Sequence, residues 1–318
     1  MECLDFFFLA THTLGFISLC KALIHFLSWV WAMFLRPPKQ LKDYGSWAII
    51  TGSTDGIGKA MALEFASKGL NLLLVGRNPL KLEATSKEIK EKHGDDIEIK
   101  FVVIDLEKDN GEEIVKKLEG AIDGLDVGIL VNNAGLAYPY ARFFHEVDLE
   151  LMDAIMKVNV VGTTWVTKAV LPIMIKKKKG AIINIGSGST VVLPSYPLVT
   201  LYAASKAYLA MFTKCISLEY RNVGIDIQCQ VPLFVSTKMT RMRASMFVPT
   251  PEMYSKACTK WIGYESVVVP YFFHYLQWFL IRAIPDALVD SYLLRYFLYW
   301  RKRGLSKDSK IKASGASS

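Results

Sequence analysis

A glycine-rich turn between a predicted strand and a predicted helix constrains the fold of this chain more than any other feature. Residues 47–50 are apolar and predict a buried strand, residues 51–58 read TGSTDGIG, and apolar residues at helical spacing follow. Strand, glycine turn and helix form the context of a dinucleotide-binding fingerprint, because glycine lets backbone N–H groups approach a pyrophosphate at a helix N-terminus. The spacing is TGxxxGxG rather than GxGxxG, so a generic glycine turn is the alternative. The candidate cofactor contacts are Gly52, Ser53, Asp55, Gly56, Ile57 and Gly58.

Five more apolar runs predict strands, over residues 70–75, 97–104, 127–131, 181–185 and 225–231. Helical stretches alternate with these runs, among them a charged amphipathic one over 80–92 and a long one over 149–175. This alternation predicts a doubly wound parallel α/β sheet with right-handed crossovers. Ligands of such sheets bind at the carboxyl ends of the strands, so the residues that follow each strand are the candidates for a site.

Arg77 and Asp105 follow the second and third predicted strands. Dinucleotide folds that prefer NAD usually place an acid near the end of the second strand, where it holds the ribose 2′-hydroxyl. This chain has Arg77 there, and a guanidinium suits a 2′-phosphate, so Arg77 predicts NADP(H) as the cofactor. The alternative is an arginine that is simply exposed in the turn. Asp105 can meet the adenine edge, or it can cap the next helix.

Small and polar residues follow the fourth and sixth predicted strands. Residues 132–135 read NNAG, and small residues there allow close contact with the ribose of a cofactor, while the asparagines tie neighbouring strands together. The loop after the sixth strand would pass the nicotinamide. The candidate cofactor contacts in these two loops are Asn132, Ala134, Gly135, Pro232, Val235 and Thr237.

Tyr202 and Lys206 lie four residues apart in a predicted helix and therefore share one face. The Lys206 ammonium would stabilise a phenolate and lower the pKa of Tyr202 from about 10 towards working pH. Such a tyrosine can give a proton to a carbonyl oxygen while a hydride reaches the carbon. A solvent-facing helix pair is the default interpretation of YxxxK alone. The glycine turn, the NNAG turn and a serine-bearing strand end precede the pair in order, and they favour the catalytic interpretation.

Two serines and one asparagine complete the candidate catalytic residues. Ser187 directly follows the strand over 181–185 and lies 15 residues before Tyr202, whereas Ser189 lies 13 residues before it. Both compete for the role of facing the substrate. Asn159 is flanked by valines in the long helical stretch, which predicts burial, and an unpaired buried amide is costly.

Composition indicates a membrane contact. The 318 residues are 52% hydrophobic and their mean hydropathy is +0.25, which is high for a purely soluble enzyme. The net charge of +8 suits anionic cofactors, acyl carriers or a membrane surface. Nucleic acid is not expected as a partner, because no zinc-finger spacing or RNA-binding aromatic motif accompanies the charge. The five scattered cysteines are typical of a reduced compartment, and the five histidines form no HExxH motif, so we expect no metal site.

The N-terminal segment over residues 6–35 is apolar and about long enough to cross a bilayer. Two acids precede it, and Arg36, Lys39 and Lys42 follow, so the positive-inside rule places the main domain in the cytosol. A cleaved signal peptide fits less well, because a basic n-region and a clear cleavage site are missing. Lys21 is costly at the middle of a bilayer, so a membrane-surface helix or hairpin is the alternative.

Taken together, Tyr202 with Lys206, the TGSTDGIG and NNAG turns and Asn159 resemble the short-chain dehydrogenase/reductase family over about residues 47–237. The N-terminal anchor, Arg77, QCQVP at 228–232 and TKM at 237–239 resemble its very-long-chain 3-oxoacyl-CoA reductases, and most closely the plant β-ketoacyl reductases of the endoplasmic reticulum. That branch also includes 17β-hydroxysteroid dehydrogenase-like proteins. The resemblance implies a Rossmann-type sheet and NADPH-dependent reduction of long-chain 3-oxoacyl-CoA to 3-hydroxyacyl-CoA in microsomal fatty-acid elongation. It also implies acyl-CoA, membrane lipid and other elongation enzymes as partners, at the endoplasmic reticulum membrane.

The family pattern implies a role for each catalytic candidate. Tyr202 is the general acid, Lys206 lowers its pKa and holds the nicotinamide ribose, a serine hydrogen-bonds the carbonyl, and Asn159 supports a water relay to Lys206. The family usually has Ile-Ser-Ser at the strand end, where this chain has Ile-Gly-Ser at 185–187. Alignment of the strand favours Ser187, whereas the common 13-residue spacing would choose Ser189.

The C-terminal region from 261 to 300 is rich in aromatic residues, which could form an apolar tunnel or a path into lipid for an acyl chain. The ordinary core of a helical cap is the alternative. Arg301-Lys302-Arg303 suits anionic head groups, and the polar tail from 306 is expected to be disordered. The expected organisation is an anchor and linker over 1–42, a catalytic domain over 43–240, a substrate-covering, membrane-associated cap over 241–303 and a polar tail over 304–318.

Two other functions use the same sequence features. A 17β-hydroxysteroid, or another lipid ketone, would react at the same catalytic residues, so the active site alone does not separate it from an acyl-CoA. A catalytically weak subunit that binds partners in an elongation complex is the second alternative.

Overall fold

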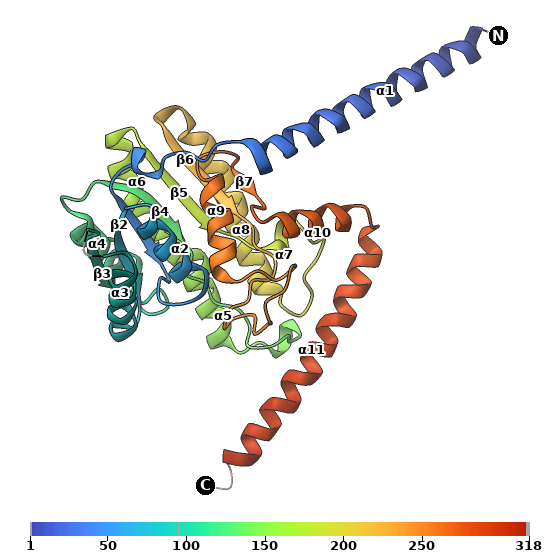
Figure 1. Ribbon diagram of the computed structural model, residues 1–318. Helices are drawn as coiled ribbons and strands as arrows, with labels where there is room; N and C mark the ends of the chain where they lie inside the picture. Colours follow the sequence, from blue (N-terminus) through green and yellow to red (C-terminus); the bar gives the residue numbers. More distant parts are fainter. Residues whose placement is uncertain (1, 95, 316–318) are drawn as a thin grey trace. The chain divides into compact units, whose positions relative to one another are not determined.

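The computed structural model describes residues 2–94 and 96–315. The chain divides into two compact units, one ending at Pro38 and one beginning at Lys39 (Figure 1). The second unit starts four residues before residue 43, the expected start of the catalytic domain, because Leu41 and Tyr44 are buried in its core.

The second unit contains one seven-stranded parallel sheet with the order β3-β2-β1-β4-β5-β6-β7. The strands are β1 Trp47–Thr51, β2 Asn71–Gly76, β3 Ile99–Val103, β4 Val127–Asn132, β5 Gly180–Ile185, β6 Ile225–Gln230 and β7 Val267–Val268. The predicted doubly wound parallel sheet is confirmed, and its order reverses between β1 and β4. The two-residue strand β7 is too short to show a pattern in the sequence.

Helices connect the strands and cover both faces of the sheet (Figure 1). They are α2 Gly56–Ser67, α3 Pro79–His93, α4 Gly111–Ile122, α5 Leu149–Met156, α6 Thr163–Lys177, α7 Gly188–Val191, α8 Thr200–Glu219, α9 Pro251–Trp261, α10 Phe272–Arg282 and α11 Asp286–Gly315. The shorter helical segments are η2 Leu41–Asp43, η3 Phe144–Glu146, the π-helical η4 Lys157–Gly162 and η5 Arg221–Val223.

Alternation along each strand divides the core between the two faces of the sheet. Ala48 and Ile50 of β1 pack with α2, α3 and α9, whereas Trp47 and Ile49 pack with α4, α6 and α8. Both faces of β1, β4 and β5 are therefore buried, which explains why these strands appear in the sequence as continuous apolar runs. The edge strand β3 is partly exposed.

Local sequence signals set several helix starts. The Asn78 side chain accepts a hydrogen bond from the Lys81 N–H, and Pro79 occupies the first turn of α3. At α4, Asn110 and Glu113 form a reciprocal capping box. These caps fix where the chain leaves the carboxyl edge of the sheet, and this edge carries the candidate site.

The first unit contains α1 Glu2–Val30, which continues as the π-helical η1 Trp31–Leu35. Residues 5–35 are long and apolar enough to cross a membrane, by length and composition. The described residues form one continuous helix without a hairpin, and neighbouring residues such as Phe6, Phe7 and Phe8 are all exposed. Apolar side chains therefore occupy every side of α1, which is more typical of a membrane span than of a surface helix.

A second segment, residues 149–177, passes the same test of length and composition, but half of it is buried. It comprises α5, η4 and α6, and Val166, Val170 and Met174 belong to the core against the sheet. We therefore describe it as a core helix.

The C-terminal region belongs to the second unit and is mostly helical. Helix α11 continues to Gly315, so the expectation of a disordered tail from residue 306 is wrong for its described part. No proline interrupts the chain after Pro285, and a helix held by its earlier turns can continue.

Candidate active site

The glycine turn after β1 lies directly against the loop after β4. Gly52 has a φ of +64°, and a Cβ at this position would lie 3.0 Å from the Ala134 Cα. The side chain of Asn133 donates hydrogen bonds to the carbonyls of Thr51 (3.0 Å) and Gly52 (3.2 Å). A Cβ at Gly58 would overlap the Gly52 carbonyl oxygen. The predicted turn therefore needs glycine at 52 and 58, so that α2 can begin close to the sheet.

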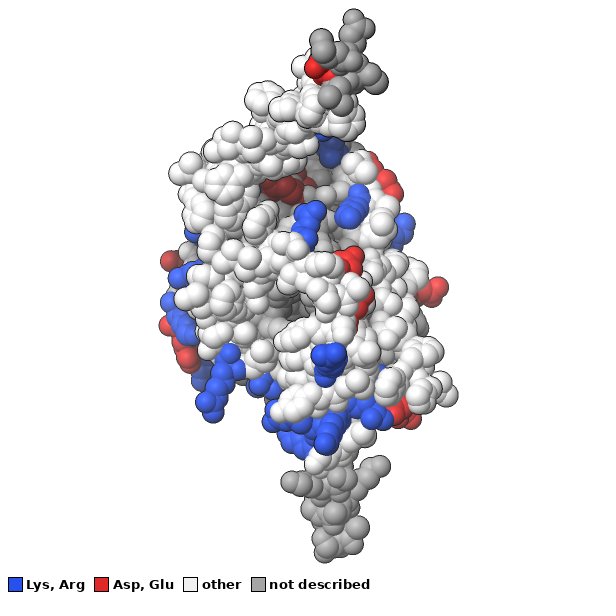
Figure 2. Space-filling view, turned by 90° about the vertical axis from the view of Figure 1, so that its right-hand side faces the viewer, with Lys and Arg blue, Asp and Glu red and all other residues white. Residues whose placement is uncertain are grey.

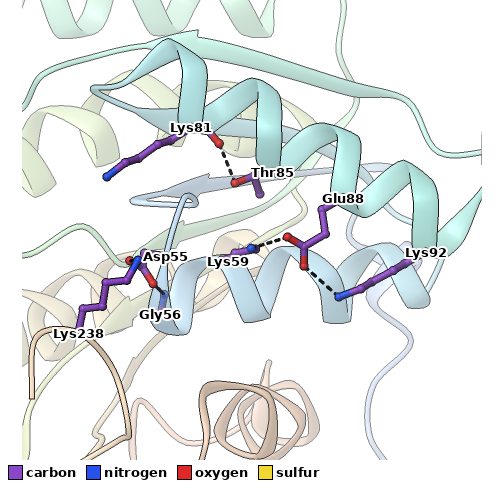
Figure 3. Close-up of polar contacts among 8 residues, drawn as sticks. All are labelled: Asp55, Gly56, Lys59, Lys81, Thr85, Glu88, Lys92 and Lys238. Carbon is purple, nitrogen blue, oxygen red and sulfur yellow. Dashed lines mark hydrogen bonds and ion pairs between the residues drawn. The ribbon is translucent and has the colours of Figure 1, made fainter. Parts of the chain in front are cut away.

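The start of α2 meets the loop after β6, although these two segments lie far apart in the sequence. Gly56 has a φ of +52°, and a Cβ there would lie 3.3 Å from the Thr237 side chain. Asp55 caps α2 by accepting the Gly56 N–H at 2.8 Å, and Lys238 pairs with Asp55 at 2.7 Å (Figure 3). Burial favours a higher pKa for Asp55, but the bonds from Lys238 and Gly56 outweigh it and lower the pKa.

A cavity of about 330 Å³ opens beside this helix start, between α2, the end of α3, loop 236–238 and the first turn of α9. Figure 3 shows the ion pairs on its wall, where Glu88 of α3 accepts Lys59 at 2.5 Å and Lys92 at 2.9 Å. Both pairs lower the pKa of Glu88, and the pair with Lys59 joins α2 to α3. The N–H groups at the start of α2 and the lysines around them favour an anion such as a diphosphate.

The next residues of the predicted cofactor site lie at the ends of β1, β2 and β3. Ser53 is buried and its hydroxyl donates to the Val75 carbonyl at 3.3 Å, while Ile57 packs partly against the core. Arg77 is 66% exposed and pairs with Glu107 at 3.3 Å, so its guanidinium is available at the surface but has a competing partner. The Asp105 side chain accepts the Glu107 N–H at 3.1 Å, and this bond stabilises the turn rather than a ligand.

A line of buried polar side chains crosses the middle of the sheet. The Asn132 amide donates to Asn184 at 2.8 Å and to Thr167 at 3.0 Å, and Asn184 in turn donates to Thr213 at 2.8 Å. These bonds connect β4 and β5 to α6 and α8. Asn132 thus has the strand-joining role predicted for the asparagines. The Ala134 N–H donates to the Thr51 hydroxyl at 3.1 Å and holds the NNAG loop on β1.

Tyr202 lies near the start of α8 and contacts Ser187, which directly follows β5. Burial raises the pKa of Tyr202, and hydrogen bonding with the Ser187 side chain lowers it only in part. Ser189 lies behind Ser187: its hydroxyl donates to the Ser187 Oγ at 2.9 Å and its N–H does so at 3.2 Å. The structure thus brings Ser187, rather than Ser189, to the tyrosine.

Lys206 is buried one turn after Tyr202, and its Nζ donates to the Ile185 carbonyl at 2.8 Å. Burial lowers the pKa of Lys206 to about 8. The expectation that Lys206 lowers the pKa of Tyr202 does not hold in this structure. Burial acts on both groups, raising the pKa of the phenol and lowering that of the amine, since each prefers its neutral form away from water.

Asn159 lies in the π-helical segment η4 and is buried, as its valine neighbours predicted. Its Oδ1 accepts the Leu136 N–H at 2.7 Å, and its Nδ2 donates to the Leu136 carbonyl and to the Ser205 hydroxyl, both at 2.9 Å. The Ser205 hydroxyl donates to the Tyr202 carbonyl at 2.7 Å. The π-helical turn therefore connects the loop after β4 to the helix that carries Tyr202.

Gly135 lies between these groups. A Cβ at this position would lie 3.5 Å from the Lys206 Nζ and 3.6 Å from the Asn159 Oδ1. The lysine and the asparagine therefore face the same small space, as a shared water relay requires.

His274 is a site residue that the sequence did not reveal. It is fully buried in α10, where its Nδ1 accepts the Leu233 N–H at 3.2 Å and its Nε2 lies 3.1 Å from the Phe234 carbonyl. These partners require the neutral imidazole with its proton on Nε2. Burial lowers the pKa of His274 to about 4, which maintains that form. His274 therefore fastens the loop that contains the candidates Pro232, Val235 and Thr237, of which Val235 is buried in the core.

Helix α11 closes the apolar side of the site. Val289, Leu293 and Phe297 of α11 form a cluster with Leu198 and Val199, and Tyr202 packs against this cluster. Tyr196 stacks edge-on against Phe297, with the ring centroids 4.6 Å apart. A proton donor thus lies under an apolar cover, where a ligand with a long apolar part would be shielded from water. No group of three or more His, Cys, Asp or Glu side chains that could hold a metal occurs among the described residues.

Solved structures with the same fold include a 7β-hydroxysteroid dehydrogenase, with a TM-score of 0.70 and 25% identity over 80% of this chain and 98% of that one. A metagenomic short-chain oxidoreductase in complex with NADP has a TM-score of 0.60 and 25% identity, over 70% of this chain and 96% of that one.

Three curated relatives match most of the chain. A very-long-chain 3-oxoacyl-CoA reductase-like protein of Arabidopsis thaliana is 46% identical over 92% of this chain and 94% of its own length. The human very-long-chain 3-oxoacyl-CoA reductase is 38% identical over 84% of each chain. The human inactive hydroxysteroid dehydrogenase-like protein 1 is 37% identical over 78% of this chain and 75% of its own.

The sequence profile described as short chain dehydrogenase matches residues 46–246, which contain the sheet from β1 to β6, the glycine turn and the Tyr202 region. With this match and these relatives, the chain belongs to the short-chain dehydrogenase family.

Proposed function

We propose that this protein reduces long-chain 3-oxoacyl-CoA to 3-hydroxyacyl-CoA with NADPH, as a step of fatty-acid elongation. The observation that carries the proposal is the contact of Tyr202 with Ser187 beneath the apolar inner side of α11. It combines a proton donor for a carbonyl with a cover suited to an acyl chain. The names of the Arabidopsis and human relatives support the choice of substrate.

The residues around the glycine turn fit a dinucleotide. Gly52, Gly56 and Gly58 leave the space that a Cβ would fill, and the start of α2 directs N–H groups at that space. We assign the diphosphate to this helix start and the ribose 2′-phosphate to Arg77, which first has to release Glu107. Asp105 would face the adenine, and Thr237 the carboxamide. When bound, the reduced nicotinamide supplies the hydride for the carbonyl carbon.

Tyr202 gives its proton to the 3-oxo oxygen. Its raised pKa suits this role, because the phenol stays protonated at neutral pH. The Ser187 oxygen already accepts two hydrogen bonds from Ser189, so its own hydrogen can be donated to the same substrate oxygen. Ser189 is thus a positioning residue. Lys206 and Asn159, which share the space at Gly135, would return a proton to Tyr202 through a water.

We assign the protein to the endoplasmic reticulum membrane, with α1 as the anchor and the catalytic unit in the cytosol. Arg36, Lys39 and Lys42 follow the apolar segment, whereas Asp5 precedes it, and this asymmetry supports the orientation. We also propose association with other elongation enzymes, because this protein would use the product of one such enzyme and supply the substrate of another.

The test follows NADPH absorbance in microsomes that contain the protein, with a long-chain 3-oxoacyl-CoA as substrate. We expect Tyr202→Phe to lower the rate by about 100-fold or more, since general acid catalysis is worth roughly 10²–10⁴-fold. NADPH binding, measured by fluorescence, should not change. Tyr208→Phe is the matched control, because Tyr208 lies on the same helix and its hydroxyl contacts only Thr164 among the described residues.

Two outcomes would contradict the proposal. Turnover of a 17β-hydroxysteroid without turnover of the acyl-CoA would assign the same residues to a steroid. NADPH binding without turnover of either substrate would indicate a non-catalytic partner, as the name of one relative suggests for that protein.

A further inference from the structure

The outer side of α11 is apolar although it faces away from the core. Leu288 is 62% exposed, Tyr292 66% and Tyr299 58%. These positions are four and seven residues apart and therefore line one edge of the helix. The inner side, by contrast, carries Val289 and Leu293, which are buried against the Tyr202 region.

A second exposed apolar edge runs along the other flank of the same helix. Leu294 and Leu298 are 43% and 39% exposed and lie one turn apart. At 100° per residue, Arg295 and Lys302 project between the two apolar edges. Both cations are exposed, and neither forms an ion pair with a described side chain. The outer side of α11 therefore presents basic residues flanked by leucine and tyrosine.

The end of α10 continues this surface. Phe279 and Leu280 are 65% and 54% exposed, and Ile284 in the turn before α11 is 44% exposed. Figure 2 shows that this side of the molecule is largely uncharged, with Lys and Arg gathered towards the bottom of the view. We refer to residues 279–303 on this side as the α10–α11 outer face.

We propose that the α10–α11 outer face docks on the surface of a lipid bilayer that contains anionic head groups. An exposed helix with apolar edges and basic residues is what an interfacial helix requires, and tyrosines are favoured at the boundary between head groups and acyl chains. The charge is complementary as well, since residues 279–303 carry five Lys or Arg and two Asp. Of the five cations, Arg301 forms an ion pair with Glu146 and the other four remain for lipid phosphates. One of these acids, Asp290, accepts the Ser195 hydroxyl at 2.5 Å and so points towards the inner side.

A second copy of the chain fits this face less well than lipid. In an isologous dimer the same patch contacts itself, which would bring the Arg295 and Lys302 side chains of one copy against the same basic patch of the other. Like charges at a buried interface are costly, whereas lipid phosphates neutralise them. The helix α1 would in addition keep the second unit near a bilayer, because only a short segment of chain joins the two.

Docking in this way has a consequence that rests on the proposed function. The inner side of α11 covers Tyr202, so the helix would separate the active site from the lipid by its own thickness, about 10–12 Å. A substrate whose acyl tail is dissolved in the bilayer could then reach Tyr202 along the helix without crossing water.

The experiment places a bimane fluorophore on single cysteines of the full chain reconstituted in vesicles. Half-buried Cys20 and exposed Cys215, together with Cys3, are replaced by serine, while the buried Cys229 and Cys258 are kept. Tyr292→Cys and Leu298→Cys report on the outer face, and Glu83→Cys on the exposed side of α3 is the matched control. Quenching is compared between a lipid-borne nitroxide and aqueous iodide, in phosphatidylcholine with or without phosphatidylserine.

We expect lipid quenching at Tyr292→Cys and Leu298→Cys to exceed that at Glu83→Cys by about threefold or more, and iodide quenching to show the reverse. Adding Arg295→Gln and Lys302→Gln should reduce the lipid quenching in vesicles with phosphatidylserine. Equal iodide quenching at all three positions would overturn the proposal, as would protection from both quenchers, which would indicate a protein partner or a second copy. Because α1 keeps every variant on the vesicle, the readout reports the face itself. NADPH oxidation with a short, water-soluble 3-oxoacyl thioester, measured on the same samples, separates this outcome from failure of the catalytic proposal.

Discussion

Gly186 stands where the family usually has serine, and the structure provides a reason that can be tested. A Cβ at position 186 would lie 2.6 Å from the Sγ of Cys229, about 1 Å inside the roughly 3.5–4.0 Å at which such atoms attract. Cys229 is fully buried, with Val192, Ala210 and Val231 around it. Its sulfur can move away only by turning into these neighbours. We therefore expect Gly186→Ala to destabilise the protein by about 1–3 kcal/mol, the usual cost of overpacking a core.

A double-mutant cycle tests this steric explanation. Cys229→Ala removes the sulfur and should recover about 1–2 kcal/mol of the loss caused by Gly186→Ala, as a coupling energy. Thermal unfolding in detergent measures it, at roughly 2–4 °C per kcal/mol. Because Ser187 follows directly, NADPH-dependent turnover should fall with Gly186→Ala and recover in the double variant. Gly120→Ala in α4 is the control, since nothing lies within 4 Å of its Cβ position. Additive losses in the cycle, or a Gly186→Ala variant as stable as the parent, would refute the reasoning.

Three further predictions concern single groups. Lys206 has its pKa lowered by burial from 10.5 to about 8, so between these values the unfolded chain binds more protons than the folded one. The difference in melting temperature between the parent and Lys206→Met should therefore shift in favour of the parent as the pH rises from about 8 to 10.5. A difference that does not change with pH would contradict this prediction. Arg77→Asp should lower the ratio of kcat/KM for NADPH to kcat/KM for NADH by about 10- to 100-fold. This factor corresponds to the loss of a charge-assisted hydrogen bond, which is worth roughly 1.5–3 kcal/mol. An unchanged ratio would disprove the assignment of the 2′-phosphate to Arg77. His274→Phe leaves two backbone groups of the loop after β6 without their hydrogen-bond partner. The Kd for NADPH in a fluorescence titration should therefore rise, while kcat changes less. An unchanged Kd would mean that the conformation of the loop does not depend on His274.

Much of the fold was predictable because the signals are local. Apart from the partly exposed edge strand β3, the apolar runs that predicted strands are buried on both faces of the sheet, and the glycine turn is tied to a positive φ at Gly52 and Gly56. Strand β7 was missed because two residues are too few to show the alternation of apolar and polar side chains that identifies a strand. The helical tail after residue 306 was missed because composition records polarity, whereas helix continuation depends on what the preceding turns pack against.

The candidate site was predictable where one strand end or one helix face contains the partners. The spacing of Tyr202 and Lys206 predicted that they lie one turn apart on one helix, and the place of Ser187 after β5 favoured it over Ser189, whereas the 13-residue spacing favoured Ser189. The direction of the Tyr202 pKa was predicted wrongly, because burial depends on elements from across the chain and the sequence shows only the neighbouring charge. His274 was missed for a related reason. Its partners, Leu233 and Phe234, precede it by about 40 residues, and nothing in an aromatic-rich stretch distinguishes a histidine that holds a loop from one that fills space.

The role of helix α11 could be predicted only in part from its composition, because the role depends on which side of the helix each aromatic residue lies. In the sequence, all aromatic residues of this segment have the same status. They were therefore compatible with an apolar tunnel for an acyl chain, with a path into lipid, or with the ordinary core of a helical cap. The helical phase separates them: Phe297 packs towards the Tyr202 region, whereas Tyr292 and Tyr299 are exposed on the other side. These alternatives are therefore not exclusive, since one face of the helix completes the core over the site and the opposite face is exposed, which is the face we propose for lipid. A helix with apolar side chains on both faces does not show the amphipathic pattern of a helix that covers a soluble domain. The segment is therefore unusually rich in aromatic residues for such a helix.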